Sequence, residues 1–130
     1  MKAITLRQPF ASLVSIGAKT IETRPWSTDY LGQLAIHSGN FALPPIDTYC
    51  RNLLISAGLD YAQLPFGKII AVATLISCEK VITSKIPCYP QLAFSDFTPG
   101  LYALEFADIR PLTTPVPAKG YTQLWEWEER

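Results

Sequence analysis

A lysine, a glutamate and an arginine fall within six residues of the sequence, and a tryptophan follows two residues later. They are Lys19, Glu22, Arg24 and Trp26. In an extended strand alternate side chains share a face, so Glu22, Arg24 and Trp26 point to one side. A carboxylate beside a guanidinium fixes its orientation, and the fixed guanidinium can bind a phosphate or carbonyl oxygens. An indole on the same face can stack on a base for about 1–3 kcal/mol. The segment therefore predicts a small site for an anion or a base.

The neighbouring carboxylate also determines which chemistry suits Lys19. A lysine that acts as a general base must lose its proton near neutral pH, which requires burial away from a countercharge. Glu22 favours the charged ammonium, so Lys19 is better suited to bind an anion or to stabilise an oxyanion. If the protein is an enzyme, Lys19 and Glu22 are the catalytic candidates, with Glu22 as general acid and base. The spacing is also typical of an exposed strand with weak ion pairs, so that interpretation stays open.

His37 and Ser38 are further candidates for ligand contact. His37 is the only histidine and ends a predicted strand, where it either contacts a ligand or serves as a hydrogen-bonded structural residue. Trp125 and Trp127 share a face at a spacing of two, and they either close the core or form a pocket wall. The sequence has no G-x-S-x-G, Walker A or G-x-G-x-x-G motif, which excludes P-loop nucleotide hydrolysis and a dinucleotide-binding fold.

Charge and composition exclude other classes of protein. Eleven Lys and Arg residues balance eleven Asp and Glu residues, whereas a broad grip on duplex DNA needs many uncompensated cations. The apolar run at residues 69–76 is far shorter than a membrane span. Three cysteines without a C-x-x-C pair predict reduced thiols and a cytoplasmic protein. One histidine and scattered thiols predict no metal site, and no motif indicates a cofactor.

Hydrophobic patterning predicts the elements that position these residues. Apolar and β-branched runs bounded by Gly or Pro predict strands, and apolar residues at i, i+3 and i+4 predict helices. The predicted strands cover residues 2–6, 19–24, 34–37, 69–76 and 100–106, and the predicted helices cover residues 9–16 and 45–57. The prolines at 44 and 45 would open the second helix. Three later prolines, at 111, 115 and 117, would break the segment after residue 106 into an edge or a loop.

The pattern predicts one domain over residues 1–130 that is mainly β with flanking helices (α+β). The run at residues 69–76 lacks strict alternation, which is typical of a central strand buried on both faces. Short connections and scattered turn signals favour a small, mainly antiparallel sheet or barrel with two main helices.

The order of these segments resembles the ASCH domain of the PUA-like superfamily. The matching pieces are L-R-Q-P-F-A at residues 6–11, G-x-K-x-x-E-x-R at 17–24, G-x-L-A-I-H at 32–37, G-K-I-I-A at 67–71, P-x-x-G at 117–120 and L-W-E-W at 124–127. The resemblance covers essentially the whole chain and implies a PUA-like antiparallel β-barrel with helices around it. It also implies that Lys19, Glu22 and Arg24 line a cleft beside the first helix that binds RNA or a nucleotide-like ligand.

The same resemblance includes a possible hydrolase. Some proteins of this family are amidohydrolases that act on N4-acetylcytidine through a lysine, a threonine and a glutamate. Their lysine maps to Lys19, but Glu22 stands where their threonine would be. The hydroxyl nucleophile is therefore missing from that position.

Three functions follow as hypotheses. The first is a binding module that holds a single-stranded RNA segment or a modified nucleotide in a small cationic cleft. Its expected ligand contacts are Lys19, Glu22, Arg24, Trp26, His37 and Ser38. The second is a hydrolase of amidohydrolase or ribonuclease type, acting through Lys19 and Glu22 on a modified nucleoside or on RNA. The third is a protein-interaction module that uses the proline-rich surface at residues 87–99.

Overall fold

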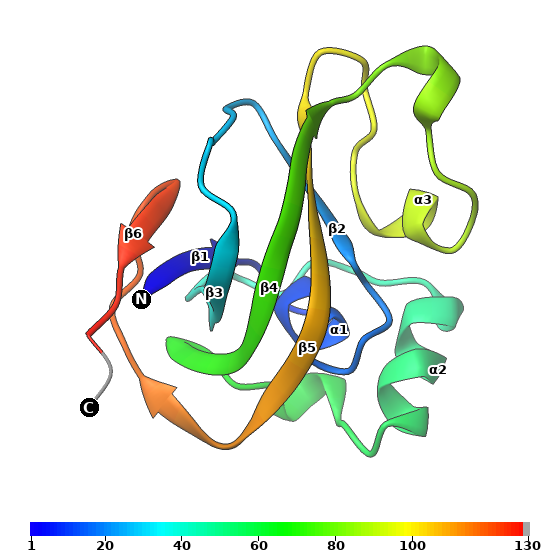
Figure 1. The fold of residues 1–130 in the computed structure, drawn as a ribbon. Helices are drawn as coiled ribbons and strands as arrows, with labels where there is room; N and C mark the ends of the chain where they lie inside the picture. The colour runs from blue at the N-terminus through cyan, green and yellow to red at the C-terminus, as the bar shows by residue number, and fades with distance from the viewer. Residues whose placement is uncertain (129–130) are drawn as a thin grey trace.

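Six strands form one curled sheet in the computed structural model, which describes residues 1–128 (Figure 1). The strands are β1 (Lys2–Leu6), β2 (Ile21–Arg24), β3 (Gly32–Ser38), β4 (Lys68–Lys80), β5 (Tyr102–Pro117) and β6 (Leu124–Glu126). Their order is β2-β5-β4-β3-β1-β6, and only the β1–β3 pair is parallel. The predicted mainly β, mainly antiparallel fold is confirmed. It takes the form of a curled half-barrel whose edges are β2 and β6.

The long strands β4 and β5 form the middle of the sheet. The apolar run at residues 69–76 lies inside β4, which pairs with β3 on one side and β5 on the other, so the predicted central position is confirmed. The predicted burial on both faces holds only for residues 69–71, because burial alternates from there on and Ile76 is exposed. Contrary to the predicted break, β5 continues through Pro111 and Pro115 to Pro117. Because β2 pairs with β5 only over residues 102–105, these prolines fall on a stretch whose other side is a free edge. Prolines are tolerated at such an edge, where the missing N–H can face away from the paired strand.

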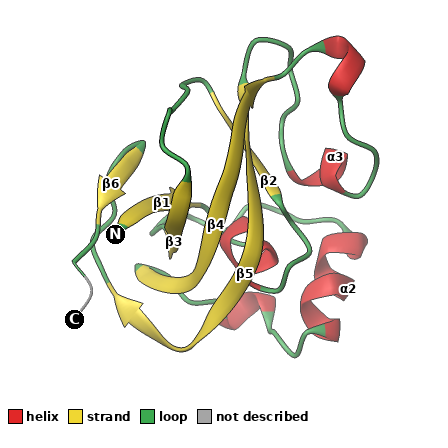
Figure 2. Cartoon of the chain, viewed as in Figure 1, coloured by secondary structure: helices red, strands yellow, loops and turns green. Residues whose placement is uncertain are grey.

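Three short helices, α1 (Phe10–Ser15), α2 (Thr48–Ser56) and α3 (Gln91–Phe94), lie on one side of the sheet (Figure 2). Two 3-10 turns, Tyr61–Gln63 and Thr83–Lys85, accompany them. The helix predicted over residues 45–57 begins later, at Thr48. Asp47 caps it by accepting a hydrogen bond from the Cys50 amide at 2.8 Å, so the prolines at 44 and 45 precede the cap instead of opening the helix.

The strand predicted over residues 19–24 begins only at Ile21, and the difference turns Lys19 out of the sheet. Gly17 takes a left-handed conformation (φ 80°) after α1, and the amides of Ala18 and Lys19 both donate to Leu13 O at 3.0 Å. The Gln91 side chain then donates to Ala18 O at 2.8 Å and accepts from the Thr20 amide at 3.0 Å. These bonds hold residues 18–20 against α3, while Thr20 O still accepts from the Phe106 amide of β5 at 2.8 Å.

Helix α1 connects the sheet to α2 and α3. Its Ala11 and Val14 are fully buried among sheet residues such as Leu104, while Leu13, on its other face, packs with Leu54 and Phe94. This packing sets Phe94 and the following residue close to β2. At the far end of the sheet, the indoles of residues 125 and 127 are buried in a second cluster, so they close the core there. Both also line a surface cavity together with residues 116–119, so each of the two predicted roles is present.

Candidate functional site

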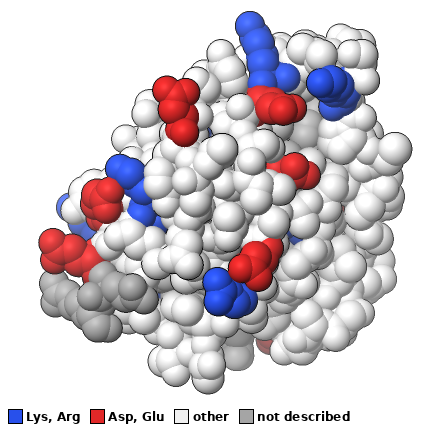
Figure 3. Space-filling view, viewed as in Figure 1, with Lys and Arg blue, Asp and Glu red and all other residues white. Residues whose placement is uncertain are grey.

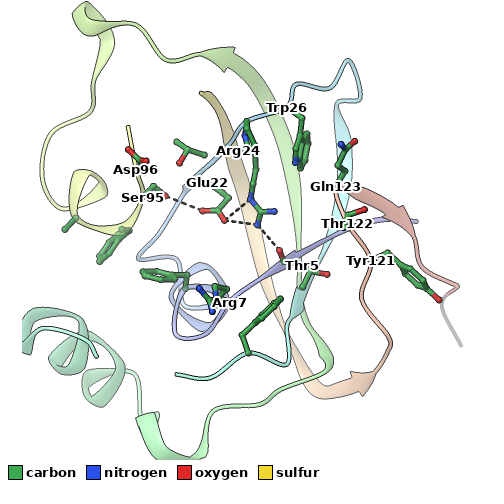
Figure 4. A pocket seen from close by; sticks show the side chains of 16 residues that line it. Thr5, Arg7, Glu22, Arg24, Trp26, Ser95, Asp96, Tyr121, Thr122 and Gln123 are labelled. Carbon is green, nitrogen blue, oxygen red and sulfur yellow. Dashed lines mark hydrogen bonds and ion pairs between the residues drawn. The ribbon is translucent and has the colours of Figure 1, made fainter. Parts of the chain in front are cut away.

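A cavity of about 890 Å3 opens where the end of β1, strand β2, the end of α3 and the turn before β6 meet (Figure 4). We call it the main cavity. Its walls are formed by Thr5 and Arg7, by residues 22–26, by residues 93–96 and by residues 121–123, with Phe10 and Phe41 completing it. Its volume falls within the range of about 300–1,000 Å3 that is typical of small-molecule sites.

Arg24 is held in the wall of the main cavity by two neighbours. Its Nε and Nη2 donate to Glu22 Oε2 at 3.2 and 2.9 Å, and Nη2 also donates to Thr5 O at 2.8 Å. The predicted carboxylate–guanidinium pair is therefore present in the cavity wall. Within residues 1–128, no hydrogen bond engages Nη1, so its two N–H groups are available to a ligand.

Lys19 lies behind this wall and does not line the main cavity. Its side chain is fully buried, with Nζ 2.7 Å from Ile21 O and 2.8 Å from Phe94 O. Nζ also contacts the hydroxyl of Ser95 and lies 3.2 Å from Glu22 Oε1. The lysine thus braces the carboxylate that orients the arginine, and it reaches a ligand only through Glu22 and Ser95.

Burial lowers the pKa of Lys19, and the charge of Glu22 opposes that shift. Both proton states fit the geometry. A charged ammonium has three N–H groups for the carbonyls of Ile21 and Phe94 and the hydroxyl of Ser95. A neutral amine keeps two N–H groups for the carbonyls and offers its lone pair to the Ser95 O–H.

Aromatic side chains and a second arginine form the remaining walls. Trp26 follows the end of β2 and stands beside Arg24 (Figure 4). The guanidinium of Arg7 lies 5.0 Å from the centre of the exposed Phe41 ring, within cation–π distance. Within residues 1–128, Arg7 makes no ion pair. The main cavity therefore carries a stacking surface and two guanidinium groups.

A side cavity of about 390 Å3 adjoins the main cavity and contains His37. His37 Nε2 donates to Ala118 O at 2.8 Å, so in the neutral ring Nδ1 accepts from the Thr5 hydroxyl at 3.1 Å. That hydroxyl in turn accepts from Trp125 Nε1 at 3.1 Å. Burial lowers the pKa of His37, and the bond to Ala118 opposes the shift. His37 is therefore a hydrogen-bonded residue at the base of the side cavity.

Ser38, the last predicted contact, is buried at the end of β3. Its hydroxyl donates to Lys68 O at 3.1 Å, and it lines neither the main nor the side cavity. Of the six predicted contacts, the main cavity thus brings together Glu22, Arg24 and Trp26. Lys19 braces them from behind, and His37 belongs to the side cavity.

Several cavity residues were not predicted as site residues. Arg7 lies in the matched L-R-Q-P-F-A segment, and its position just after β1 was the available signal. Ser95 lies more than seventy residues from Lys19, and only the packing of α3 against α1 brings them together. Gln123 lies on the rim with a left-handed φ of 57°. A non-glycine residue in this conformation is uncommon and is found more often near functional sites.

Charges of the two signs are mixed on one face of the molecule. Figure 3 shows Lys and Arg interspersed with Asp and Glu on the face viewed, without an extended area of one sign. At the main cavity, Arg7 and Arg24 face Glu22 and Asp96, and the buried Lys19 adds one positive charge. Any attraction for an anion is therefore local to the cavity.

Two further features are absent from residues 1–128. No group of three or more His, Cys, Asp or Glu side chains is arranged to hold a metal ion. None of the helices in this part of the chain combines the length and the apolar character needed to cross a bilayer.

Comparison with known proteins identifies the class to which this fold and cavity belong. The model of the ASCH domain matches residues 4–114, so the chain belongs to the ASCH domain family. The family is nucleic-acid-related, and its domains are generally RNA-binding-like. No curated protein matches the sequence.

Solved structures support the assignment of the fold. The crystal structure of ASCH from Zymomonas mobilis is similar with a TM-score of 0.59 and 15% identity, over 98% of this chain and 87% of that chain. Two mutant forms of the Zymomonas protein have TM-scores of 0.60, at 16% and 15% identity, again over 98% of this chain and over 88% and 90% of theirs. At such low identity the likeness establishes the fold alone.

Proposed function

We propose that the main cavity binds one nucleotide unit, as part of single-stranded RNA or as a modified nucleotide. The observation that carries this proposal is the free edge of Arg24. Glu22 and Thr5 O hold three of the five guanidinium N–H groups, and the two on Nη1 stay available beside Trp26. A guanidinium fixed in this way binds phosphate or carbonyl oxygens without first having to become ordered.

The balance of charge supports a small footprint. Arg7 and Arg24 are the two cations in the cavity wall, and Glu22 already neutralises part of the second. Binding should therefore release the counterions of only one or two phosphates, which gives a shallow dependence on salt. Because unpaired bases can reach a recessed aromatic ring and stacked bases of a duplex cannot, the cavity favours a single strand.

The experiment is a fluorescence-anisotropy titration of a labelled single-stranded RNA and of a duplex of equal length, at several salt concentrations. Arg24→Lys keeps the charge but loses the planar fork, and we expect it to weaken binding about tenfold. Arg110→Lys is the matched control, because Arg110 also pairs with a carboxylate two residues earlier but is exposed. Trp26→Ala should weaken binding by a similar factor. Absence of binding, a steep salt slope or equal effects at Arg24 and Arg110 would contradict the proposal.

One contact favours a second candidate function, the hydrolysis of an acylated nucleoside. Ser95 lines the main cavity, and its hydroxyl contacts Nζ of the buried Lys19. With Lys19 neutral, the lysine takes the Ser95 proton while Oγ attacks the acyl carbon. The nucleoside amine then leaves with the proton held by Lys19, and water hydrolyses the ester formed on Ser95. Here Lys19 instead of Glu22 is the base, because its Nζ is the closer group to the Ser95 hydroxyl and Glu22 Oε2 is bound to Arg24.

This candidate is tested by incubating the protein with a panel of N-acylated nucleosides and separating the products. Ser95→Ala should abolish turnover and leave nucleoside binding intact, and Ser84→Ala, on an exposed turn, should change neither. Wild-type protein that binds the nucleosides without turnover would leave binding as the function.

A further inference from the structure

We propose that the side cavity takes the nucleotide next to the one in the main cavity, so that the ligand is a single strand of two or more nucleotides. The inference rests on the proposed function and decides between its two ligands, a strand and a free nucleotide. The two cavities share Thr5, Phe41, Tyr121 and Thr122 in their walls. They are therefore neighbouring compartments of one surface.

The wall that the two cavities share is suited to bind a phosphodiester backbone. Two exposed aromatic residues, Phe41 and Tyr121, belong to both compartments, and each has a cation against its ring. The Arg7 guanidinium lies 5.0 Å from the Phe41 centroid, and Lys119 Nζ lies 5.7 Å from the Tyr121 centroid. Arg7 lines the main cavity and Lys119 the side cavity. A phosphate that links two nucleotides across this wall would thus have a positive charge on either side.

The side cavity has the size and the polar groups for one nucleobase or nucleoside. Its volume of about 390 Å3 lies at the lower end of the range of roughly 300–1,000 Å3 for small-molecule sites. Asn40 supplies a side-chain amide for base edges. Within residues 1–128, neither this amide nor the Lys119 ammonium has a hydrogen-bond or ion-pair partner among the side-chain interactions. Both groups are therefore available to a ligand.

The floor that joins the compartments is rigid. The Thr5 carbonyl accepts a hydrogen bond from the Arg24 guanidinium, and the Thr5 hydroxyl is hydrogen-bonded to the His37 ring. Thr5 therefore helps to position the walls of both cavities. Gly120 closes the side cavity against the same residues. A Cβ at that position would lie 2.7 Å from His37 Cε1 and from Thr5 Oγ1, so only glycine lets the turn approach so closely. The two compartments are thereby held at a fixed separation, as consecutive nucleotides of one strand require.

The experiment compares a mononucleotide, a dinucleotide and a tetranucleotide, as uridylate and adenylate ladders, by calorimetric titration at low salt. We expect the dinucleotide of at least one ladder to bind about tenfold more tightly than its mononucleotide, and the tetranucleotide to add little. Lys119→Ala and Asn40→Ala, which alter the side cavity and leave the main cavity intact, should each weaken dinucleotide binding about threefold to tenfold and leave mononucleotide binding unchanged. Lys85→Ala is the matched control, since it removes one exposed lysine that lines neither cavity.

The outcomes separate this inference from the function on which it rests. If the mononucleotide binds and Trp26→Ala weakens it, but the dinucleotide binds no more tightly, the side cavity is not a nucleotide subsite and the main cavity still is. An equal effect of Lys119→Ala on both ligands would also overturn the inference, because it would indicate a general effect of charge. If no member of either ladder binds, the proposed function fails, and the inference fails with it.

Discussion

Two arginines of this protein pair with a carboxylate two residues earlier, and the two pairs differ in almost everything else. Glu22 and Arg24 lie on β2 with Oε2 and Nη2 2.9 Å apart, and their side chains are 15% and 23% exposed. Asp108 and Arg110 lie on β5 at 3.4 Å and are 67% and 63% exposed. Only the first pair lines the main cavity. The i, i+2 spacing of opposite charges therefore does not by itself define a binding site.

The two pairs differ in the contacts that each makes with other residues. Glu22 Oε1 faces Lys19 Nζ and the Ser95 hydroxyl, and Arg24 also binds Thr5 O. Within residues 1–128, the pair on β5 has no such additional partners. A network of buried, hydrogen-bonded charges keeps its members in one geometry, whereas an exposed pair is screened and mobile. Burial and supporting contacts thus turn a common charge spacing into a preorganised site.

The largest effect on stability is expected from replacing Lys19, which supports Glu22 from behind the cavity wall. Lys19→Met keeps the length of the side chain but leaves the carbonyls of Ile21 and Phe94 without their donor and Glu22 with one cation fewer. We expect a loss of about 3–5 kcal/mol in the free energy of unfolding, as for other broken buried charge pairs. Urea denaturation measures it, with Lys80→Met, at the exposed end of β4, as the control. A change below about 0.5 kcal/mol would mean that the network does not support the fold.

A smaller loss of stability should follow from neutralising Glu22, which contacts both Lys19 and Arg24. Glu22→Gln weakens the bonds to Arg24 and sets an amide N–H close to donors that need an acceptor, so we expect a loss of about 1–3 kcal/mol together with weaker RNA binding. Asp108→Asn, its counterpart on β5, should cost less than about 0.5 kcal/mol. High salt should abolish the effect at Asp108 and preserve most of that at Glu22. Equal losses at the two positions in denaturation experiments would show that burial does not distinguish the pairs.

Local pattern was sufficient for most of the sheet strands and for part of the candidate site, but not for α3, β6 or the full length of β5. The apolar run inside β4 predicts a central strand, and alternation along β2 predicts that Glu22, Arg24 and Trp26 share one side. All three line the main cavity, although Thr23 and Pro25 between them do so too and Trp26 lies beyond the end of β2. These outcomes depend on periodicity within a few residues, which a sequence displays directly.

Features that depend on distant contacts could not be predicted. Lys19 leaves the predicted strand because Gln91, seventy-two residues later, binds the backbone on either side of it. Ser95 enters the site for the same reason, since the packing of α3 decides where it lies. The prolines of β5 are tolerated because strand β2 is too short to reach them. Each case is a tertiary contact that overrides a correct local rule.

The smallest expected effect is a pH dependence of stability that arises from the burial of His37. Burial holds the pKa of His37 below its usual 6.5. As pH falls through that range, the unfolded chain takes up a proton that the folded chain resists, so stability should decrease below about pH 6.5 and be unaffected by His37 above it. His37→Gln can keep a donor towards Ala118 O and an acceptor for Thr5, and it should remove this dependence. Denaturation at several values between about pH 5 and pH 7 tests it, because carboxylates titrate mostly below that window. A slope that persists in His37→Gln, the only histidine being gone, would assign the pH dependence to other groups and break the link between burial and the His37 proton.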